Sequence, residues 1–252
     1  MLGAMLGVTL VVTLKLPYPL AALGVAVLVG LLFLAFQIGI IEPLRRRRAS
    51  LTSMVMATLA LSIFLEGAAE LVWGPLELPA PSPVGNQPID ISGVGFVPHD
   101  LLVLAITLVS FAVLQVLFSR TLTGKSLLAT GYEPEAARLV GISPLRMVAL
   151  SFALGGGFAA LAGLVISPIT FAAPWMGLPL AVKGFAAAMV GGLGSVPGAL
   201  VGGIAVGLLE TFAAFYVSSA YSDAFVFLLL MIVLFTRPTG LLGSPMVTGE
   251  HF

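Results

Sequence analysis

The sequence LAALGVAVLVGLLFLAFQIGII, which covers Leu20–Ile41, contains no charged residue. A helix needs roughly 20 predominantly apolar residues to cross the hydrocarbon core of a bilayer. This stretch is therefore predicted to be a transmembrane helix. Glu42 and Pro43 follow it, and because proline disfavours a continuing helix, we expect the helix to end there.

The composition of the whole chain extends this prediction to all 252 residues. Hydrophobic residues make up 59% and charged residues 9%, with a mean hydropathy of +1.15, whereas soluble domains are roughly a quarter charged. So few charges cannot cover a water-facing surface, and most of the surface must face lipid. We predict an all-α fold, a polytopic transmembrane helical bundle with broken or re-entrant helices, forming a single domain over residues 1–252.

Several kinds of chemistry have little support in the sequence. The formal net charge is zero, which gives no indication of nucleic-acid binding, and the absence of cysteine excludes disulfides and thiolate metal sites. Gly124-Lys125-Ser126 resembles the end of a phosphate-binding loop, but the required first glycine is missing. No nucleophile–base pair or metal-ligand cluster is evident, so we expect no catalytic residue, metal or cofactor. An intramembrane enzyme using Glu210 or Asp223 stays the least favoured alternative.

The positions of the basic residues predict how the chain crosses the membrane. Arg45–Arg48 follow the first span, Arg120, Lys125, Arg138 and Arg146 occur together, and Arg237 follows the last span. Cytoplasmic loops are enriched in Lys and Arg, so residues 119–146 are predicted to be cytoplasmic, and Lys15 and Lys183 are exceptions. Residues 73–100, rich in proline and glycine, are predicted to be an external loop. The further predicted spans are Leu51–Val72, Leu101–Phe118, Met147–Ser167, two short crossings around residues 191–198, and Ser222–Thr236.

The N-terminal segment Met1–Leu14 is apolar but too short to span a bilayer alone. Lys15, Pro17 and Pro19 stop it, and it lacks the charged start and the cleavage site of a signal peptide. A missing upstream helix would explain this segment better than a signal peptide does.

Residues 131–142, GYEPEAARLVGI, are predicted to form a short amphipathic helix within the loop 119–146. Its acidic start suits the helix dipole, and Ala136, Ala137, Leu139 and Val140 would form a small apolar face. Such a face could dock in a groove of a cytosolic partner. An ordinary solvated loop helix is the alternative.

Glycines interrupt the apolar run at residues 191–198, GGLGSVPG, and allow two interpretations. Non-helical backbone within a membrane is tolerated where it is buried in protein or lines a watery cavity, which would place the break in a translocation pathway. Gly194, Gly198 and Gly202 also recur every four residues, as Gly155, Ala159 and Gly163 do, a spacing typical of close helix packing.

Glu210 is the most deeply placed ionisable residue of an apolar run, and such residues are usually functional or paired. It could equally lie at the membrane interface. Lys183 could be its partner, but we favour a side chain that extends to the outer interface instead. His99, beside Asp100 at a helix start, is predicted to be a polar surface residue.

Several segments together resemble the permeases of branched-chain amino acid ABC transporters, particularly the shorter of the two permease types. Within the loop 119–146, EAARLVGI at 135–142 resembles the coupling-loop sequence of that family. EPLR at 42–45, ATLALSIFL at 57–65, KGFAAAMVGGLGSVPGALVGG at 183–203 and RPTGLLG at 237–243 also resemble the family pattern, in the same order.

The resemblance implies a permease subunit of an ATP-driven importer in a bacterial-type inner membrane. It implies a second permease subunit, homologous or identical, two cytosolic ATPase subunits that bind the ATP, and an external solute-binding protein. Glu135, Ala136, Ala137, Arg138 and Gly141 would form the coupling loop. The candidate pathway or helix-break residues are Gly191, Gly192, Gly194, Ser195, Gly198 and Glu210. The family also includes importers of amides and urea, and a self-sufficient channel or secondary transporter is the alternative function.

Overall fold

The computed structural model describes residues 1–47, 49–85, 89–91, 94–237 and 239–243. Arg48 of the predicted basic cluster and Pro238 of the 237–243 segment lie outside the described residues. The chain divides into two compact units, residues 1–176 and 177–252. Five helices of the described part are long and apolar enough to cross a membrane, which confirms the all-α polytopic bundle: Tyr18–Arg46, Thr52–Trp73, Pro98–Arg120, Pro144–Thr170 and Val196–Tyr216.

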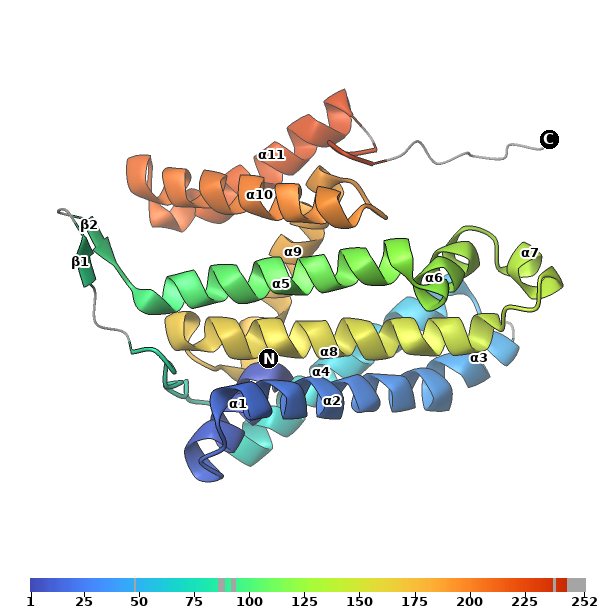
Figure 1. Cartoon of the computed structure of the whole chain (residues 1–252), viewed down its shortest axis with the longest axis horizontal. Coiled ribbons are helices and arrows are strands. Elements are labelled where there is room, and N and C mark those ends of the chain that lie inside the picture. The colour runs from blue at the N-terminus through green and yellow to red at the C-terminus, as the bar shows by residue number, and fades with distance from the viewer. Residues whose placement is uncertain (48, 86–88, 92–93, 238, 244–252) are drawn as a thin grey trace. The chain divides into compact units, whose positions relative to one another are not determined.

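In the described residues of the first unit, helices dominate and β1 and β2 form a short hairpin (Figure 1). Helices α2 and α8 lie side by side in it, and α1 also packs on α8. Its elements are α1 (Leu2–Val8), the π turn η1 (Thr9–Thr13), α2 (Tyr18–Phe36), the π turn η2 (Gln37–Ile41), α3 (Glu42–Arg46), α4 (Leu51–Trp73), β1 (Ile89–Ile91), β2 (Val94–Phe96), α5 (Pro98–Arg120), α6 (Leu122–Tyr132), α7 (Pro134–Leu139), α8 (Pro144–Thr170) and the 3-10 turn η3 (Pro174–Met176).

The first span does not end at Glu42-Pro43 as predicted, because the helix continues through η2 and α3 to Arg46. At η2 the amide of Glu42 donates to the carbonyl of Gln37, five residues back. Pro43 thereby falls in the first turn of α3, where a missing amide proton is tolerated. The Glu42 carboxylate, which is buried, accepts from Arg45 and Arg46 at 2.9 Å each.

Helix α8 also runs past its predicted end, from Ser167 to Thr170, with Pro168 inside it. A proline in a helix leaves the carbonyl four residues back without its amide donor. Here that carbonyl belongs to Leu164, and it accepts from the Ser167 hydroxyl at 2.8 Å and from the Tyr18 hydroxyl at 3.3 Å. These side-chain donors let the helix continue.

Small residues bring α1, α2 and α8 into close contact, and of the three predicted on α8 only Gly163 takes part. A Cβ at Gly3 would overlap the backbone of Ala160, and one at Gly156 would press on the Phe33 ring. A Cβ at Gly163 would lie 3.2 Å from the Ala4 amide nitrogen, whereas Gly155 and Ala159 are exposed. A four-residue spacing does not distinguish two adjacent stripes of one helix, and the contact residues Gly156 and Ala160 each lie one residue beyond a predicted position.

The described residues between α4 and α5 lie within the predicted loop 73–100, and β1 and β2 make a small antiparallel hairpin there. His99, predicted to be at the surface, is 1% exposed. Its Nε2 donates to the Val165 carbonyl at 3.0 Å, and its Nδ1 lies 3.1 Å from the Ser82 hydroxyl. The prediction was wrong because the first turn of α5 packs on α8, and the ring ties the loop to that helix.

The second unit consists of α9 (Gly177–Gly191), α10 (Val196–Tyr216), the 3-10 turn η4 (Ser219–Tyr221) and α11 (Ser222–Thr236). The bounds of α11 match the prediction, but α10 is a full-length helix, not a short crossing. The three helices pack on one another around Ala186, Val190, Val206, Val226 and Val233.

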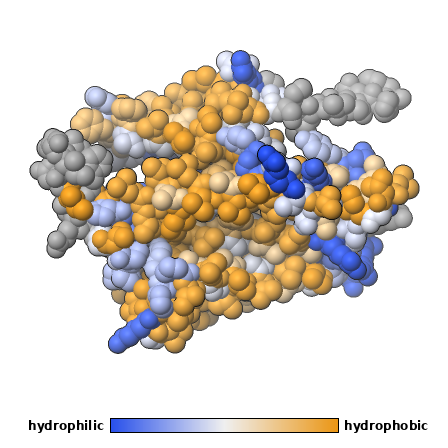
Figure 2. Space-filling view, in the orientation of Figure 1, coloured by the Kyte–Doolittle hydropathy of each residue, from blue (hydrophilic) through white to orange (hydrophobic). Residues whose placement is uncertain are grey.

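The outward surface of the long helices is apolar, and Figure 2 shows hydrophobic side chains over most of the visible face. In α5 every side chain except that of His99 is exposed or half-buried. On α4, Ile63, Phe64 and Leu71 are each 70% exposed or more. Such large apolar side chains cannot face water in these numbers, so they contact lipid or other membrane helices.

Candidate functional site

Helix α7 lies in the loop between α5 and α8, where the sequence predicts a partner-binding helix. Glu133 precedes it in an extended conformation, and Pro134 begins it. Arg138 Nη1 lies 3.1 Å from Glu135 Oε1, and these side chains are 50% and 77% exposed. An exposed pair of this kind contributes little to stability, so both charges are available to a partner.

The apolar residues of α7 do not form the single face that was predicted. Ala137 is 3% exposed and points inward, whereas Ala136 is exposed, and Leu139 and Val140 are 89% and 76% exposed. The prediction failed at Ala137, because α7 packs on α6 and α8 and this side chain faces that contact. The inward alanine anchors α7, and the outward apolar residues form its free surface.

Gly141 ends this segment in the left-handed region, with φ of +85°. Its amide donates to the Arg138 carbonyl and the Ile142 amide donates to the Ala137 carbonyl, each at 3.0 Å. A left-handed residue of this kind commonly ends a helix, and glycine adopts it without steric cost. Gly141 therefore sets the direction in which the chain turns back toward α8.

Helix α6 precedes α7 and adds two further exposed side chains, Leu122 at 84% and Tyr132 at 70%. Neither residue was predicted to be a site residue. Together with Leu139 and Val140 they form an exposed set of large apolar side chains in the loop 119–146, which we call the loop surface. Its signal in the sequence is the presence of large apolar residues in an otherwise polar loop.

The glycine-rich break at residues 191–198 is a tight turn between α9 and α10. Gly192 and Gly194 have φ of +112° and +86°. Ser195 precedes α10, and its hydroxyl accepts from the Gly198 amide at 3.1 Å. The geometry of this turn therefore explains why Ser195 and two of the glycines occur here.

The segment 239–243 packs directly on this turn. The Leu241 and Leu242 amides donate to the carbonyls of Val190 and Gly191 at 2.9 and 2.8 Å. A Cβ at Gly192 would overlap the backbone of Gly243. The last carbonyls of α9 are thus satisfied by the chain's own C-terminal segment.

Gly191 and Gly198 contact each other so closely that a Cβ on either would overlap the backbone of the other, and Gly202 is equally close to Ala187. Backbone packing therefore accounts for most of this glycine-rich segment. A role for Gly191, Gly192, Gly194, Ser195 and Gly198 in a translocation pathway stays a prediction.

Glu210 is paired with Lys183, at 2.7 Å between Oε1 and Nζ. The same ammonium lies 2.8 Å from Oδ1 of Asp223, at the start of α11. Lys183 is thus a partner of Glu210, the alternative that the sequence left open, and two carboxylates from neighbouring helices bind its ammonium within the unit. Its extension to the outer interface stays a prediction. Unpaired charge is costly at membrane depth, and pairing offsets that cost.

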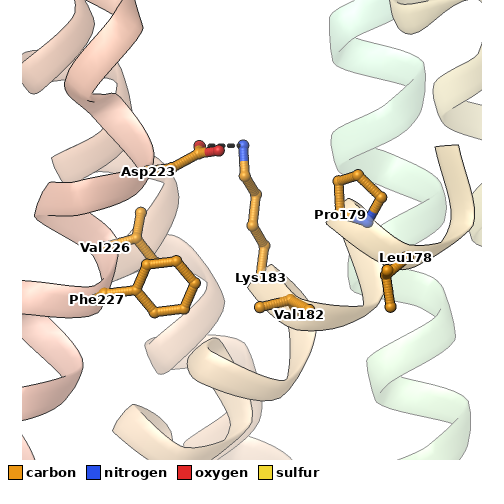
Figure 3. A pocket seen from close by; sticks show the side chains of 7 residues that line it. All are labelled: Leu178, Pro179, Val182, Lys183, Asp223, Val226 and Phe227. Carbon is orange, nitrogen blue, oxygen red and sulfur yellow. Dashed lines mark ion pairs between the residues drawn. The ribbon is translucent and has the colours of Figure 1, made fainter.

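A cavity of about 250 Å³ opens beside this ion cluster, between α9 and α11 (Figure 3). Lys183 and Asp223 form its polar end. Its remaining lining is apolar and consists of Leu178, Pro179, Val182, Val226 and Phe227. No local sequence pattern indicates this cavity, because its two sides are separated by the whole of α10.

The chain matches the family described as the branched-chain amino acid transport system permease component over residues 1–234. It is 31% identical over 198 residues to LivH, a high-affinity branched-chain amino acid transport system permease protein of Salmonella typhimurium, and 33% identical over 198 residues to BraD of Pseudomonas aeruginosa. Each alignment covers 77% of this chain and 64% of the relative.

A probable branched-chain amino acid transport permease protein LivH from Methanocaldococcus jannaschii is 28% identical over 239 residues, which cover 89% of this chain and 75% of that protein. No solved structure matches the chain significantly. The family match covers nearly all of the described helices. The apolar helices, together with the bacterial permease relatives, make this chain a multi-pass protein of the inner membrane. The chain belongs to the family of permease components of branched-chain amino acid transport systems.

Proposed function

We propose that this chain is the membrane-spanning permease subunit of an ATP-driven importer for branched-chain or related amino acids. It acts with a second permease subunit, homologous or identical, with two cytosolic ATPase subunits and with an external solute-binding protein. The ATPases bind and hydrolyse ATP, and the permease itself carries no catalytic residue and no cofactor. The names of its relatives support the substrate class.

The observation that carries this proposal is the loop surface. Large apolar side chains exposed outside the apolar spans support a protein-binding role, and here they accompany the exposed ion pair of Glu135 and Arg138. The surface belongs to a loop between two full-length membrane helices, α5 and α8. An ATPase subunit that binds α7 can therefore act on both helices.

The packing of the loop explains how a displacement of α7 by an ATPase subunit would reach the membrane helices. Ala137 anchors α7, and α6 packs on both α5 and α8. A Cβ at Gly124, near the start of α6, would overlap the backbone of Leu117 and Phe118 in α5. A contact this close transmits a displacement of α6 to the membrane helix, since close-packed protein interiors have low compressibility.

The basic residues support the sidedness of this arrangement. Arg120, Lys125, Arg138 and Arg146 support a cytoplasmic loop 119–146, because cytoplasmic loops are enriched in basic residues. Residues 73–100 would then lie outside, on the side of the solute-binding protein, where His99 ties their loop to α8.

The proposal is tested by co-expression of this chain with candidate ATPase and permease subunits from its source organism. We expect a complex that survives purification in detergent and takes up leucine into liposomes only with ATP and a binding protein. If the chain never co-purifies with an ATPase or a second permease, the proposal is wrong. Uptake by liposomes that contain this chain alone would instead establish a self-sufficient channel or secondary transporter.

A further inference from the structure

We propose that the cavity between α9 and α11 binds a zwitterionic amino acid with an aliphatic side chain, its α-carboxylate on Lys183 and its α-ammonium on Asp223. This inference rests on the proposed function as an amino-acid importer, and it assigns a substrate-binding site within the second unit.

The polar end of the cavity can offer a ligand both a positively charged hydrogen-bond donor and a negatively charged acceptor. A lysine ammonium has three donors, and Glu210 and Asp223 occupy two of them, at 2.7 and 2.8 Å. The third is free for a ligand carboxylate. The Asp223 side chain is 61% exposed, and its second oxygen can accept from a ligand ammonium.

Glu210 has a different task, because it does not line the cavity. It holds the Lys183 ammonium from the side of α10 while Asp223 turns partly toward the ligand. Without Glu210 the ammonium would keep Asp223 as its partner in this cluster, and a bound ligand ammonium would compete for that carboxylate. Glu210 is therefore a positioning residue.

The groups of the cluster favour a zwitterion over a simple ion. The cluster has one ammonium and two carboxylates and therefore a negative net charge, so an inorganic anion would be repelled. An alkylammonium ion would neutralise that charge but would leave the third Lys183 donor without an acceptor. A zwitterionic amino acid brings one positive and one negative group and leaves the net charge unchanged. Each of its charged groups also meets a partner of opposite sign.

The apolar walls determine which side chain fits. Figure 3 shows Val226 and Phe227 of α11 facing Val182 of α9 across the cavity, with the Lys183 stem running between them to its ammonium. A branched aliphatic side chain placed there would be removed from water. The volume of about 250 Å³ lies below the roughly 300–1,000 Å³ of pockets for drug-sized ligands, as expected for a small solute.

The first test measures ligand binding to the full chain in lipid nanodiscs, with radiolabelled L-leucine and unlabelled competitors. 4-Methylpentanoate lacks the ammonium group, and 3-methylbutylamine lacks the carboxylate. We expect leucine to bind about tenfold more tightly than either, or more, since a hydrogen bond to a charged group is worth this much. Equal competition by all three compounds, or tighter binding of the amine, would overturn the zwitterion site.

Variants separate a binding role from a merely structural one. Lys183→Met should weaken leucine binding and abolish the preference over 3-methylbutylamine, and Asp223→Asn should abolish the preference over 4-methylpentanoate. A residue that only holds helices together would change the amount of active protein but not these ratios. Asp100→Asn is the matched control, because Asp100 is likewise an exposed carboxylate in the first turn of a helix.

A third kind of variant leaves the ion cluster intact, in case its removal prevents folding. Val182→Phe narrows the cavity and should weaken leucine binding by about tenfold. Val201→Phe is its control, since Val182 and Val201 are 38% and 42% exposed and Val201 does not line the cavity. Equal effects of both variants would refute the site, whereas ATPase co-purification, measured in parallel, tests the proposed function separately.

Discussion

The loop helix α7 and the turn at residues 191–198 both resemble motifs of the permease family, yet their surroundings are opposite. Each contains glycine with positive φ, Gly141 in one and Gly192 and Gly194 in the other. A Cβ at Gly141 would meet open space, whereas a Cβ at Gly192 would overlap the backbone of Gly243. Similar local geometry thus serves an exposed surface in one place and a close-packed contact in the other.

This difference indicates where each motif acts. The turn is occupied by the chain's own residues 239–243, so its glycines are explained within the subunit. The α7 segment contacts the rest of its unit through Ala137 and leaves Leu139 and Val140 exposed. Substitutions in the turn should therefore change stability, and substitutions on α7 should change coupling to a partner.

The largest effect is expected for Gly192→Ala. The new Cβ would strain a left-handed residue and overlap the segment 239–243, so we expect a loss of about 2–5 kcal/mol of stability. The midpoint of thermal unfolding in detergent measures it. An unchanged midpoint would show that the C-terminal segment does not pack on the turn.

A smaller effect is expected for Gly202→Ala, with its neighbour as a matched control. Gly202 faces the backbone of α9, whereas Gly203 faces open space. Gly202→Ala should destabilise the protein by about 1–3 kcal/mol, and Gly203→Ala should stabilise it by roughly 0.5–1 kcal/mol, since alanine favours a helix. Equal midpoints for both variants would contradict the packing of α9 on α10.

Gly141→Ala should cost about 1–2 kcal/mol locally, because only backbone strain opposes it. Global unfolding should change little, while α7 loses its fixed orientation. We expect partial loss of ATPase stimulation by substrate at an almost normal thermal midpoint. Full stimulation would mean that the turn at Gly141 does not orient α7.

Much of the fold could be predicted from hydropathy and helix-breaking residues. Helix α11 has the predicted bounds, and α4 and α5 lie within a few residues of theirs. The predicted helix ends next to Pro43 and Pro168 were wrong. A π turn accommodates Pro43, and hydroxyl donors from Ser167 and Tyr18 accommodate Pro168. Such compensation depends on neighbouring turns and helices that no local pattern reveals.

The candidate site was predicted in part. The existence of α7 and its charged residues followed from the local sequence, but which alanine faces inward depends on tertiary packing. The triple ion cluster could not be assembled from sequence, because Lys183, Glu210 and Asp223 lie on three successive helices. Only the packing of those helices brings the three charges together.

The central claim, that the exposed surface of α7 couples this permease to an ATPase, is tested most directly by substrate-stimulated ATP hydrolysis of the assembled transporter. Glu135→Ala/Arg138→Ala and Leu139→Ser are compared with Leu76→Ser, which replaces a leucine that is 75% exposed in the loop between α4 and α5. We predict that both α7 variants lose stimulation by about tenfold or more while their thermal midpoints stay normal, and that Leu76→Ser keeps it. Normal stimulation in both α7 variants would contradict the claim.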